Sequence, residues 1–151
     1  MRFLIDTGIL LRLIDTGDPQ HALVTTAFQR LGERNDDLYI NTQNVAELWN
    51  VATRPVVNNG LNLPLAAVTK ALQQAIDPFC LVITEPEQMP AEFRRLLIQY
   101  NVVGKQVHDA RLVAMMLAWQ IENILTLNER DFQRYQPEGI TIATPASIVA
   151  S

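Results

Sequence analysis

The stretch from Val107 to Phe132, VHDARLVAMMLAWQIENILTLNERDF, runs from a helical pattern into a strand pattern and then into a polar turn. In its first half, apolar residues recur at spacings of three and four, and Asp109 falls in the opening turn of the predicted helix. The apolar run 124–127 has the length of a buried strand and is followed by a turn that carries Asp131. In an open parallel sheet, strand ends and helix starts lie at the edge where ligands bind. We therefore expect Asp109 and Asp131 to meet at one edge of a sheet.

The same alternation of strand and helix patterns continues through the rest of the chain. Further strand candidates lie at residues 3–5, 38–40, 79–83 and 141–143, and helical periodicity follows the first three. This order predicts an α/β fold with three α/β/α layers and a central parallel sheet of four to five strands. No linker, low-complexity tract or long repeat interrupts the 151 residues, so we expect residues 1–151 to form a single domain.

Local signals predict where several helices begin and end. Asp18 and Pro19 are residue types favoured at the N-cap and at the first helical position, so a helix should start there. The helix after the second strand is expected to turn Trp49 inward and to end at Arg54-Pro55. Residues 56–63 have the composition of a mobile loop.

Composition limits the classes of function. The apolar run 112–121 has half the length of a membrane span, and Asp6 and Arg12 interrupt the apolar core that a signal peptide needs. Cys80 is the only cysteine, which excludes an intrachain disulfide and favours a reducing compartment. We therefore expect a cytoplasmic protein without a membrane segment. The net charge of −4 argues against coating nucleic acid with a broad basic face, but it allows a small catalytic cleft with a few local cations.

The sequence Leu-Ile-Asp-Thr-Gly occurs twice, at residues 4–8 and 13–17. Only the first copy follows a strand and precedes a helix, so Asp6 is the functional candidate and Asp15 is interpreted as a solvated cap or turn residue. The motif is also the active-site signature of aspartic proteases. Two copies joined by a short helix cannot face each other to share a proton, so we reject that interpretation.

Four acidic residues are expected at the carboxyl edge of the sheet. Asp6 ends the first strand, Glu47 lies in the predicted first turn of the helix after the second strand, and Asp109 and Asp131 join them. Carboxylates that share a site repel one another, and a hard divalent cation removes that repulsion. Mg²⁺ or Mn²⁺ takes oxygen ligands, lowers the pKa of a bound water and neutralises charge on a phosphoryl oxygen. The pattern therefore indicates a hydrolytic site for phosphodiesters.

Three of these carboxylates also have a purely structural interpretation. Asn44 and Glu47 have the spacing of a capping box, in which Glu47 would reach back to the start of its helix. Asp109 would interact favourably with a helix dipole. Asp131 could form a surface ion pair with a neighbouring arginine. These alternatives stay open at the level of the sequence.

In this order and spacing, the motifs resemble the PIN-domain nucleases, and among them the VapC-like toxins of toxin–antitoxin pairs. The resemblance rests on Asp-Thr after the first strand, a Glu in the helix after the second, His-Asp-Ala at the start of a later helix, and Leu-Thr-x-Asn-x-x-Asp-Phe. It implies a Mg²⁺- or Mn²⁺-dependent endoribonuclease, the toxin of a type II system, which forms a homodimer and is held inactive by a small antitoxin protein.

The resemblance also assigns roles by position. Asp6 and Asp109 would bind the metal ion, and Glu47 and Asp131 would complete the catalytic set. Residues expected to support these carboxylates or to contact RNA are Thr7, Asn44, Thr126, Asn128, Lys105, Arg111 and Arg130, with Arg54 as a further candidate phosphate contact. The family usually has Asn or Ser where this chain has Gly8. The alternative function is therefore a catalytically weak or inactive PIN-like domain that acts as an RNA- or protein-binding module.

Overall fold

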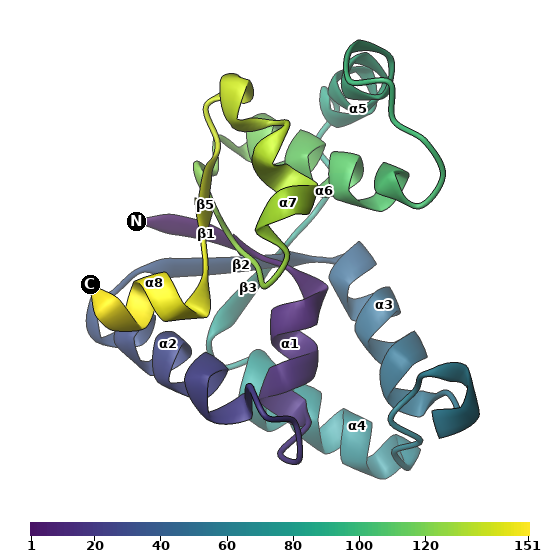
Figure 1. Ribbon diagram of the computed structural model, residues 1–151, viewed down its shortest axis with the longest axis vertical. Coiled ribbons are helices and arrows are strands. Elements are labelled where there is room, and N and C mark those ends of the chain that lie inside the picture. The colour runs from purple at the N-terminus through teal and green to yellow at the C-terminus, as the bar shows by residue number, and fades with distance from the viewer.

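One parallel sheet of five strands forms the centre of the computed structural model, which describes all 151 residues (Figure 1). The order across the sheet is β3-β2-β1-β4-β5, and every neighbouring pair is parallel. The predicted α/β fold with a parallel sheet between two helical layers is thereby confirmed. The strands are β1 (Arg2–Ile5), β2 (Asp37–Asn41), β3 (Cys80–Ile83), β4 (Asn123–Leu125) and β5 (Thr141–Ala143).

Eight α-helices cover the two faces of the sheet (Figure 1). One face carries α5 (Met89–Gln99), α6 (Gln106–Trp119) and α7 (Glu129–Gln133). The other side carries α1 (Thr7–Ile14), α2 (His21–Glu33), α3 (Thr42–Thr53), α4 (Leu65–Ala71) and α8 (Pro145–Ala150). Shorter helical turns are η1 (Val56–Asn58), η2 (Leu72–Ile76) and η3 (Gln136–Glu138). None of these helices combines the length and the apolar character needed to cross a bilayer.

Strand β1 separates the core into two halves. Successive side chains of a strand point to opposite faces, so Phe3 and Ile5 pack with α1, α2 and α8, whereas Leu4 packs with α6. All three side chains are essentially inaccessible to solvent. Full burial of such a side chain stabilises the fold by roughly 1.5–3 kcal/mol, so β1 is held firmly from both faces.

Three local predictions are wrong. Helix α2 begins at His21, because Asp18 instead accepts a 2.8 Å hydrogen bond from the amide of Gln20 in a turn that precedes the helix. Trp49 is 36% exposed and does not point into the core. The polar turn predicted after β4 is the short helix α7, with Asp131 in its first turn.

The start of α3 corrects a fourth prediction. Asn41, not Asn44, is the N-cap, and the two asparagines exchange side chain–backbone hydrogen bonds of 3.0 and 2.9 Å. Glu47 therefore lies in the second turn of α3 rather than the first, and it takes no part in capping. The interpretation of Glu47 as a capping-box residue is wrong.

The strand order reverses direction next to β1. The chain builds β2 and β3 on one side of β1 and then crosses to β4 and β5 on the other side. In open α/β sheets, ligands bind at the carboxyl ends of the strands at such a switch point. The amide of Asp6 donates a 3.0 Å hydrogen bond to the carbonyl of Leu125, which ties the ends of β1 and β4 together at this place.

Candidate active site

Four carboxylates line one open cavity at the carboxyl edge of the sheet. The cavity has a volume of about 330 Å³, and Asp6 follows β1, while Glu47, Asp109 and Asp131 come from α3, α6 and α7. Asp131 also lines two adjoining cavities together with Arg130, so the depression continues past α7. Elements that are distant in the sequence thus bring the four predicted acids to one place.

The second copy of the internal repeat lies elsewhere. Asp15 is the C-cap of α1, at the opposite end of that helix from Asp6. Its side chain accepts a 3.2 Å hydrogen bond from the amide of Gly17, which is the local turn role expected for it. The two aspartates cannot face each other, so the geometry of an aspartic protease is absent.

Asp6 is a partly buried carboxylate that accepts a hydrogen bond from a buried threonine. The hydroxyl of Thr126 donates a 2.7 Å hydrogen bond to Asp6 Oδ2 and accepts one of 3.0 Å from the amide of Asn128. Burial raises the pKa of Asp6 above its usual value. The hydrogen bond from Thr126 opposes this rise, and the charges of Glu47 and Asp131 add to it.

Both oxygens of Glu47 accept hydrogen bonds. Thr7 Oγ1 donates to Glu47 Oε2 at 2.8 Å, and Gln43 Nε2 donates to Glu47 Oε1 at 2.8 Å. Gln43 also donates to the carbonyl of His108 at 3.0 Å, so it links α3 to α6. Asn44 in turn donates to Thr7 Oγ1 at 3.1 Å. These bonds fix the direction in which the Glu47 carboxylate points.

Asp109 experiences the repulsion of the cluster most clearly. Burial, followed by the charges of Asp131, Asp6 and Glu47, raises the pKa of Asp109 to about 7, and Lys105 only partly opposes this. None of the four acids belongs to any of the five ion pairs of the protein. The interpretation of Asp131 as one partner of a surface ion pair is therefore wrong.

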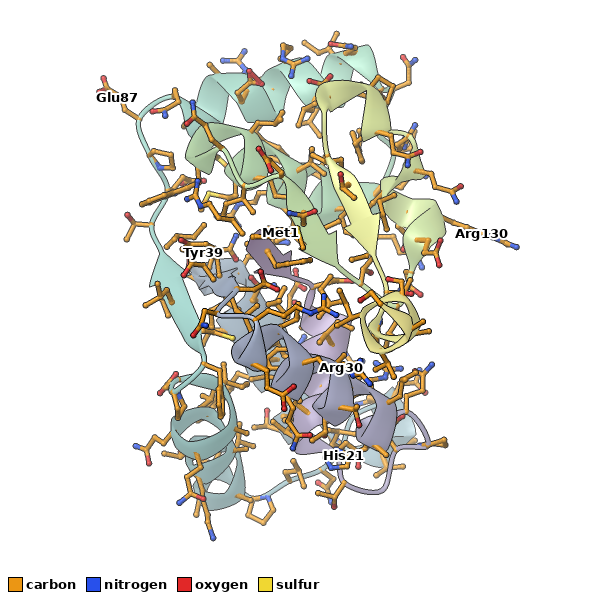
Figure 2. The ribbon with its side chains drawn as sticks, turned by 90° about the vertical axis from the view of Figure 1, so that its left-hand side faces the viewer. Met1, His21, Arg30, Tyr39, Glu87 and Arg130 are labelled. Atoms are coloured by element: carbon orange, nitrogen blue, oxygen red, sulfur yellow. The ribbon has the colours of Figure 1, made fainter.

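The basic side chains predicted near this edge of the sheet occupy different positions. Arg54 lines the same cavity as the four carboxylates. Arg130 lines the adjoining cavities, and its side chain extends from α7 into solvent (Figure 2). Arg111 pairs with Glu85 at 3.6 Å. Lys105 is exposed at the N-cap of α6, one turn before Asp109.

Sequence reasoning missed Gln43, Asn50 and Val51. Gln43 orients Glu47, and the other two residues line the cavity. All three lie three or four positions from Glu47 on α3, and residues at these spacings share one face of a helix. Helical spacing from Glu47 could therefore have identified them.

The side chains around the cavity suit a hard divalent cation. Their carboxylate oxygens are the ligand type that Mg²⁺ and Mn²⁺ prefer. No three Asp, Glu, His or Cys side chains are grouped closely enough to hold an ion by themselves. Mg²⁺ typically uses one or two protein carboxylates and keeps several waters, which this open arrangement permits. Burial and then mutual repulsion raise the pKa values of Asp6 and Asp109, and a cation would favour the ionised form of both.

Comparison with known proteins identifies the family. Residues 3–136 match the PIN domain. The chain belongs to the PIN domain family. The resemblance of its motifs to those of the PIN-domain nucleases is therefore confirmed. A comparison with curated proteins finds no match to this PIN domain protein.

Solved structures share the fold of this PIN domain. A chain of VapBC2 from Rickettsia felis, bound to a DNA fragment from their promoter, has a TM-score of 0.70 at 15% identity, with 95% of this chain and 98% of that chain covered. VapBC-1 from nontypeable Haemophilus influenzae has a TM-score of 0.60 at 17% identity, with 97% of this chain and 99% of that chain covered. FitAcB from Neisseria gonorrhoeae has a TM-score of 0.62 at 20% identity, with 95% of this chain and 98% of that chain covered. The likeness in fold to chains of these three structures thus extends over nearly the whole chain.

Proposed function

We propose that this PIN domain protein is a divalent-metal-dependent endoribonuclease and the toxin of a type II toxin–antitoxin pair. The observation that carries the proposal is the convergence of four carboxylates from separate elements on one cavity at the switch point of the sheet. A similar fold in Mycobacterium tuberculosis VapC20, described as a toxin that cleaves the sarcin–ricin loop, supports it, with a TM-score of 0.57 at 16% identity over 81% of this chain and 86% of that chain.

The acids have distinct roles in this proposal. Asp6 and Asp109 would hold a Mg²⁺ or Mn²⁺ ion, and the hydrogen bond from Thr126 favours the ionised form of Asp6 that such binding requires. When bound, such an ion would lower the pKa of a coordinated water and neutralise charge on the phosphoryl oxygens. Glu47, fixed by Thr7 and Gln43, points its carboxylate into the cavity, where it can accept a hydrogen bond from the attacking water. Asp131 is the fourth acid of the site.

The partners follow from the same proposal. The similar folds in VapBC2, VapBC-1 and FitAcB support a small antitoxin protein as the inhibitor. A homodimer as the assembled form is what the resemblance to the VapC-like toxins implies. An RNA substrate and a single buried free cysteine, Cys80, are compatible with a reducing, cytoplasmic location. Co-expression with the product of an adjacent short reading frame, followed by light scattering of the purified complex, tests both partners.

The direct test is cleavage of RNA by the purified protein. A 5′-labelled single-stranded transcript of mixed sequence is incubated in Mg²⁺, in Mn²⁺ or in EDTA. We expect fragments only with a divalent ion, and almost none from Asp6→Asn. Asp15→Asn is the matched control, because it changes the same residue type in the second copy of the repeat and should cleave like the parent.

Two outcomes contradict the proposal. RNA that is bound but never cleaved, at any concentration of either ion, means that the domain is a binding module. Equal loss of cleavage in Asp6→Asn and Asp15→Asn means that the cavity at the switch point is not the catalytic site.

A further inference from the structure

Arg54 is the one arginine that lines the cavity of the four carboxylates. It is the C-cap residue of α3 and is partly buried. It belongs to none of the five ion pairs, and its buried Nε has no hydrogen-bond partner. The positive charge of Arg54 therefore has no anionic partner within the protein, although the residue lines a cavity that is open to ligands.

The segment from 55 to 63 holds Arg54 in place. Arg54 Nη2 donates a 3.1 Å hydrogen bond to the carbonyl of Asn59. The amide of Asn62 donates to the carbonyl of Arg54 at 3.0 Å, and the amides of Leu61 and Leu63 donate to the last turns of α3 at 2.9 and 2.8 Å. The guanidinium is therefore positioned before any ligand binds.

Gly60 makes this arrangement possible. A Cβ atom at Gly60 would lie 2.0 Å from the carbonyl oxygen of Arg54 and 2.2 Å from its Cγ. Only a residue without a side chain lets the segment lie directly on Arg54. The glycine in this loop thus maintains a close approach to an arginine, which the loop-like sequence did not indicate.

The charge of Arg54 is available to an anion. No carboxylate lies within ion-pair distance of it, although four carboxylates share its cavity. A guanidinium presents a planar set of donors that matches phosphate oxygens. In protein–nucleic acid complexes, such contacts to backbone phosphates fix the register of the strand without reading its sequence.

We propose that Arg54 binds a backbone phosphate of the RNA adjacent to the one that is cleaved. This inference rests on the proposed function. It identifies the end of the cavity towards which the RNA continues beyond the cleaved phosphate. Arg130, which extends freely into solvent at α7, is the contrasting case (Figure 2). Its side chain must be immobilised when it binds, so its contribution should be smaller than that of the held Arg54.

The test compares Arg54→Gln with Arg94→Gln, a matched control at an exposed arginine of α5. Because the contact is to a phosphate that does not react, it stabilises the ground state and the transition state alike. We expect Arg54→Gln to raise KM about tenfold with little change in kcat. For a labelled RNA dodecamer bound in Ca²⁺, and shown intact by gel, the slope of log Kd against log salt should fall by about 0.7. Arg94→Gln should change neither quantity.

Two further variants separate binding from folding. Arg54→Lys keeps the charge and the packed stem, yet it should also raise KM, because an ammonium lacks the planar fork that serves Asn59 and a phosphate together. Gly60→Ala should raise KM although Arg54 is still present. Gly32→Ala is its control, since nothing lies near the added Cβ.

The outcomes separate the two proposals. A parent protein that neither binds nor cleaves RNA contradicts the proposed function and this inference with it. A parent that cleaves RNA, with Arg54→Gln and Arg54→Lys indistinguishable from Arg94→Gln in KM and in salt dependence, overturns the assignment of Arg54 alone.

Discussion

Thr126 donates a 2.7 Å hydrogen bond to Asp6, although 120 positions separate the two residues in the chain. The bond joins the residues that follow β4 and β1, the two strands on either side of the switch point. Thr126 is fully buried, and its hydroxyl lowers the pKa of Asp6 against the larger effect of burial. The order of the strands thus places a buried donor next to an acid of the site.

Thr126→Val should lower both stability and activity at neutral pH. The valine has nearly the same shape, so the loss reflects the hydroxyl, which serves Asp6 and the amide of Asn128. We expect a loss of about 1–3 kcal/mol in the free energy of unfolding. The pKa of Asp6 should rise further, which moves the acid limb of the kcat/KM profile to higher pH.

Urea unfolding and kcat/KM between pH 5 and pH 9 measure these effects. Thr25→Val is the control, because the buried hydroxyl of Thr25 has no hydrogen-bond partner and its removal should not destabilise the protein. If both valine variants behave alike, the bond from Thr126 to Asp6 has no special role.

Gln43→Leu should weaken the link between α3 and α6. It removes the hydrogen bonds from Gln43 to Glu47 and to the carbonyl of His108. We expect a loss of roughly 1–3 kcal/mol in stability, and a fall in kcat because Glu47 is no longer held in one direction. Thermal melts and RNA cleavage rates test this against Gln73→Leu, at an exposed position of η2. An unchanged kcat for Gln43→Leu would show that the orientation of Glu47 is set without Gln43.

Glu138→Gln should destabilise the protein in a pH-dependent way. Arg95 and Tyr100 donate hydrogen bonds to Glu138, and the contact with Arg95 lowers the pKa of Glu138 below its usual value. Such a group stabilises the fold above its unfolded-state pKa, and this contribution is lost as the pH falls through the folded-state pKa. Because Arg95 is 39% exposed, we expect a difference of only about 1 kcal/mol at pH 7.

The difference in the free energy of unfolding between the parent and Glu138→Gln should therefore shrink as the pH falls from neutrality towards 3. Urea unfolding at several pH values measures it. Glu87→Gln, at an exposed glutamate that extends into solvent (Figure 2), should follow the parent throughout. A Glu138→Gln difference that is constant with pH would rule out a role for the charge.

The sequence predicts the site as far as parallel topology alone can determine it. Asp6 follows a strand, and Asp109 opens a helix, so both must lie at the carboxyl edge of the sheet. It could not predict the bonds from Thr7 and Gln43 to Glu47, because they depend on how α3 is rotated relative to β1 and α6. The capping prediction for Glu47 failed because the N-cap is Asn41, one turn earlier than expected, so Asn44 fills the position predicted for Glu47.

The environment of Arg54 is equally inaccessible to sequence reasoning. Its position at the end of α3 is predicted by the following proline, which restricts the residue before it. Residues 56–63 have the composition of a mobile loop, yet they lie on Arg54 through a close contact of Gly60 and several hydrogen bonds. Contacts of this kind depend on the folded path of the loop, and they leave no periodic pattern in the sequence.

Asp109 should make the metal-free protein less stable as the pH rises. Its pKa is raised to about 7, whereas in the unfolded chain it is about 3.9. Below both values the group is protonated in both states and has no effect. Between them the unfolded chain ionises while the folded protein keeps its proton, so stability falls from about pH 4 to about pH 7.

Melting temperatures in EDTA across this window measure the effect of Asp109. The asparagine in Asp109→Asn cannot titrate, so the melting temperature of this variant should fall less with pH than that of the parent. The melting temperature of Asp15→Asn should fall as much as that of the parent. Identical slopes for the parent and Asp109→Asn would show that Asp109 does not titrate differently in the folded protein.

Binding of a divalent ion at the acidic cavity is tested most directly by thermal melts of the parent and Asp109→Asn at pH 7.5, in EDTA and in millimolar Mn²⁺. In EDTA, the asparagine variant should melt at the same temperature as the parent or higher, because one repelling charge is gone. Mn²⁺ should raise the melting temperature of the parent by mass action and that of the variant much less. An Asp109→Asn protein that is less stable in EDTA by the roughly 0.3–1 kcal/mol of a helix-dipole contact, and that gains as much from Mn²⁺ as the parent, would contradict a metal site at Asp109.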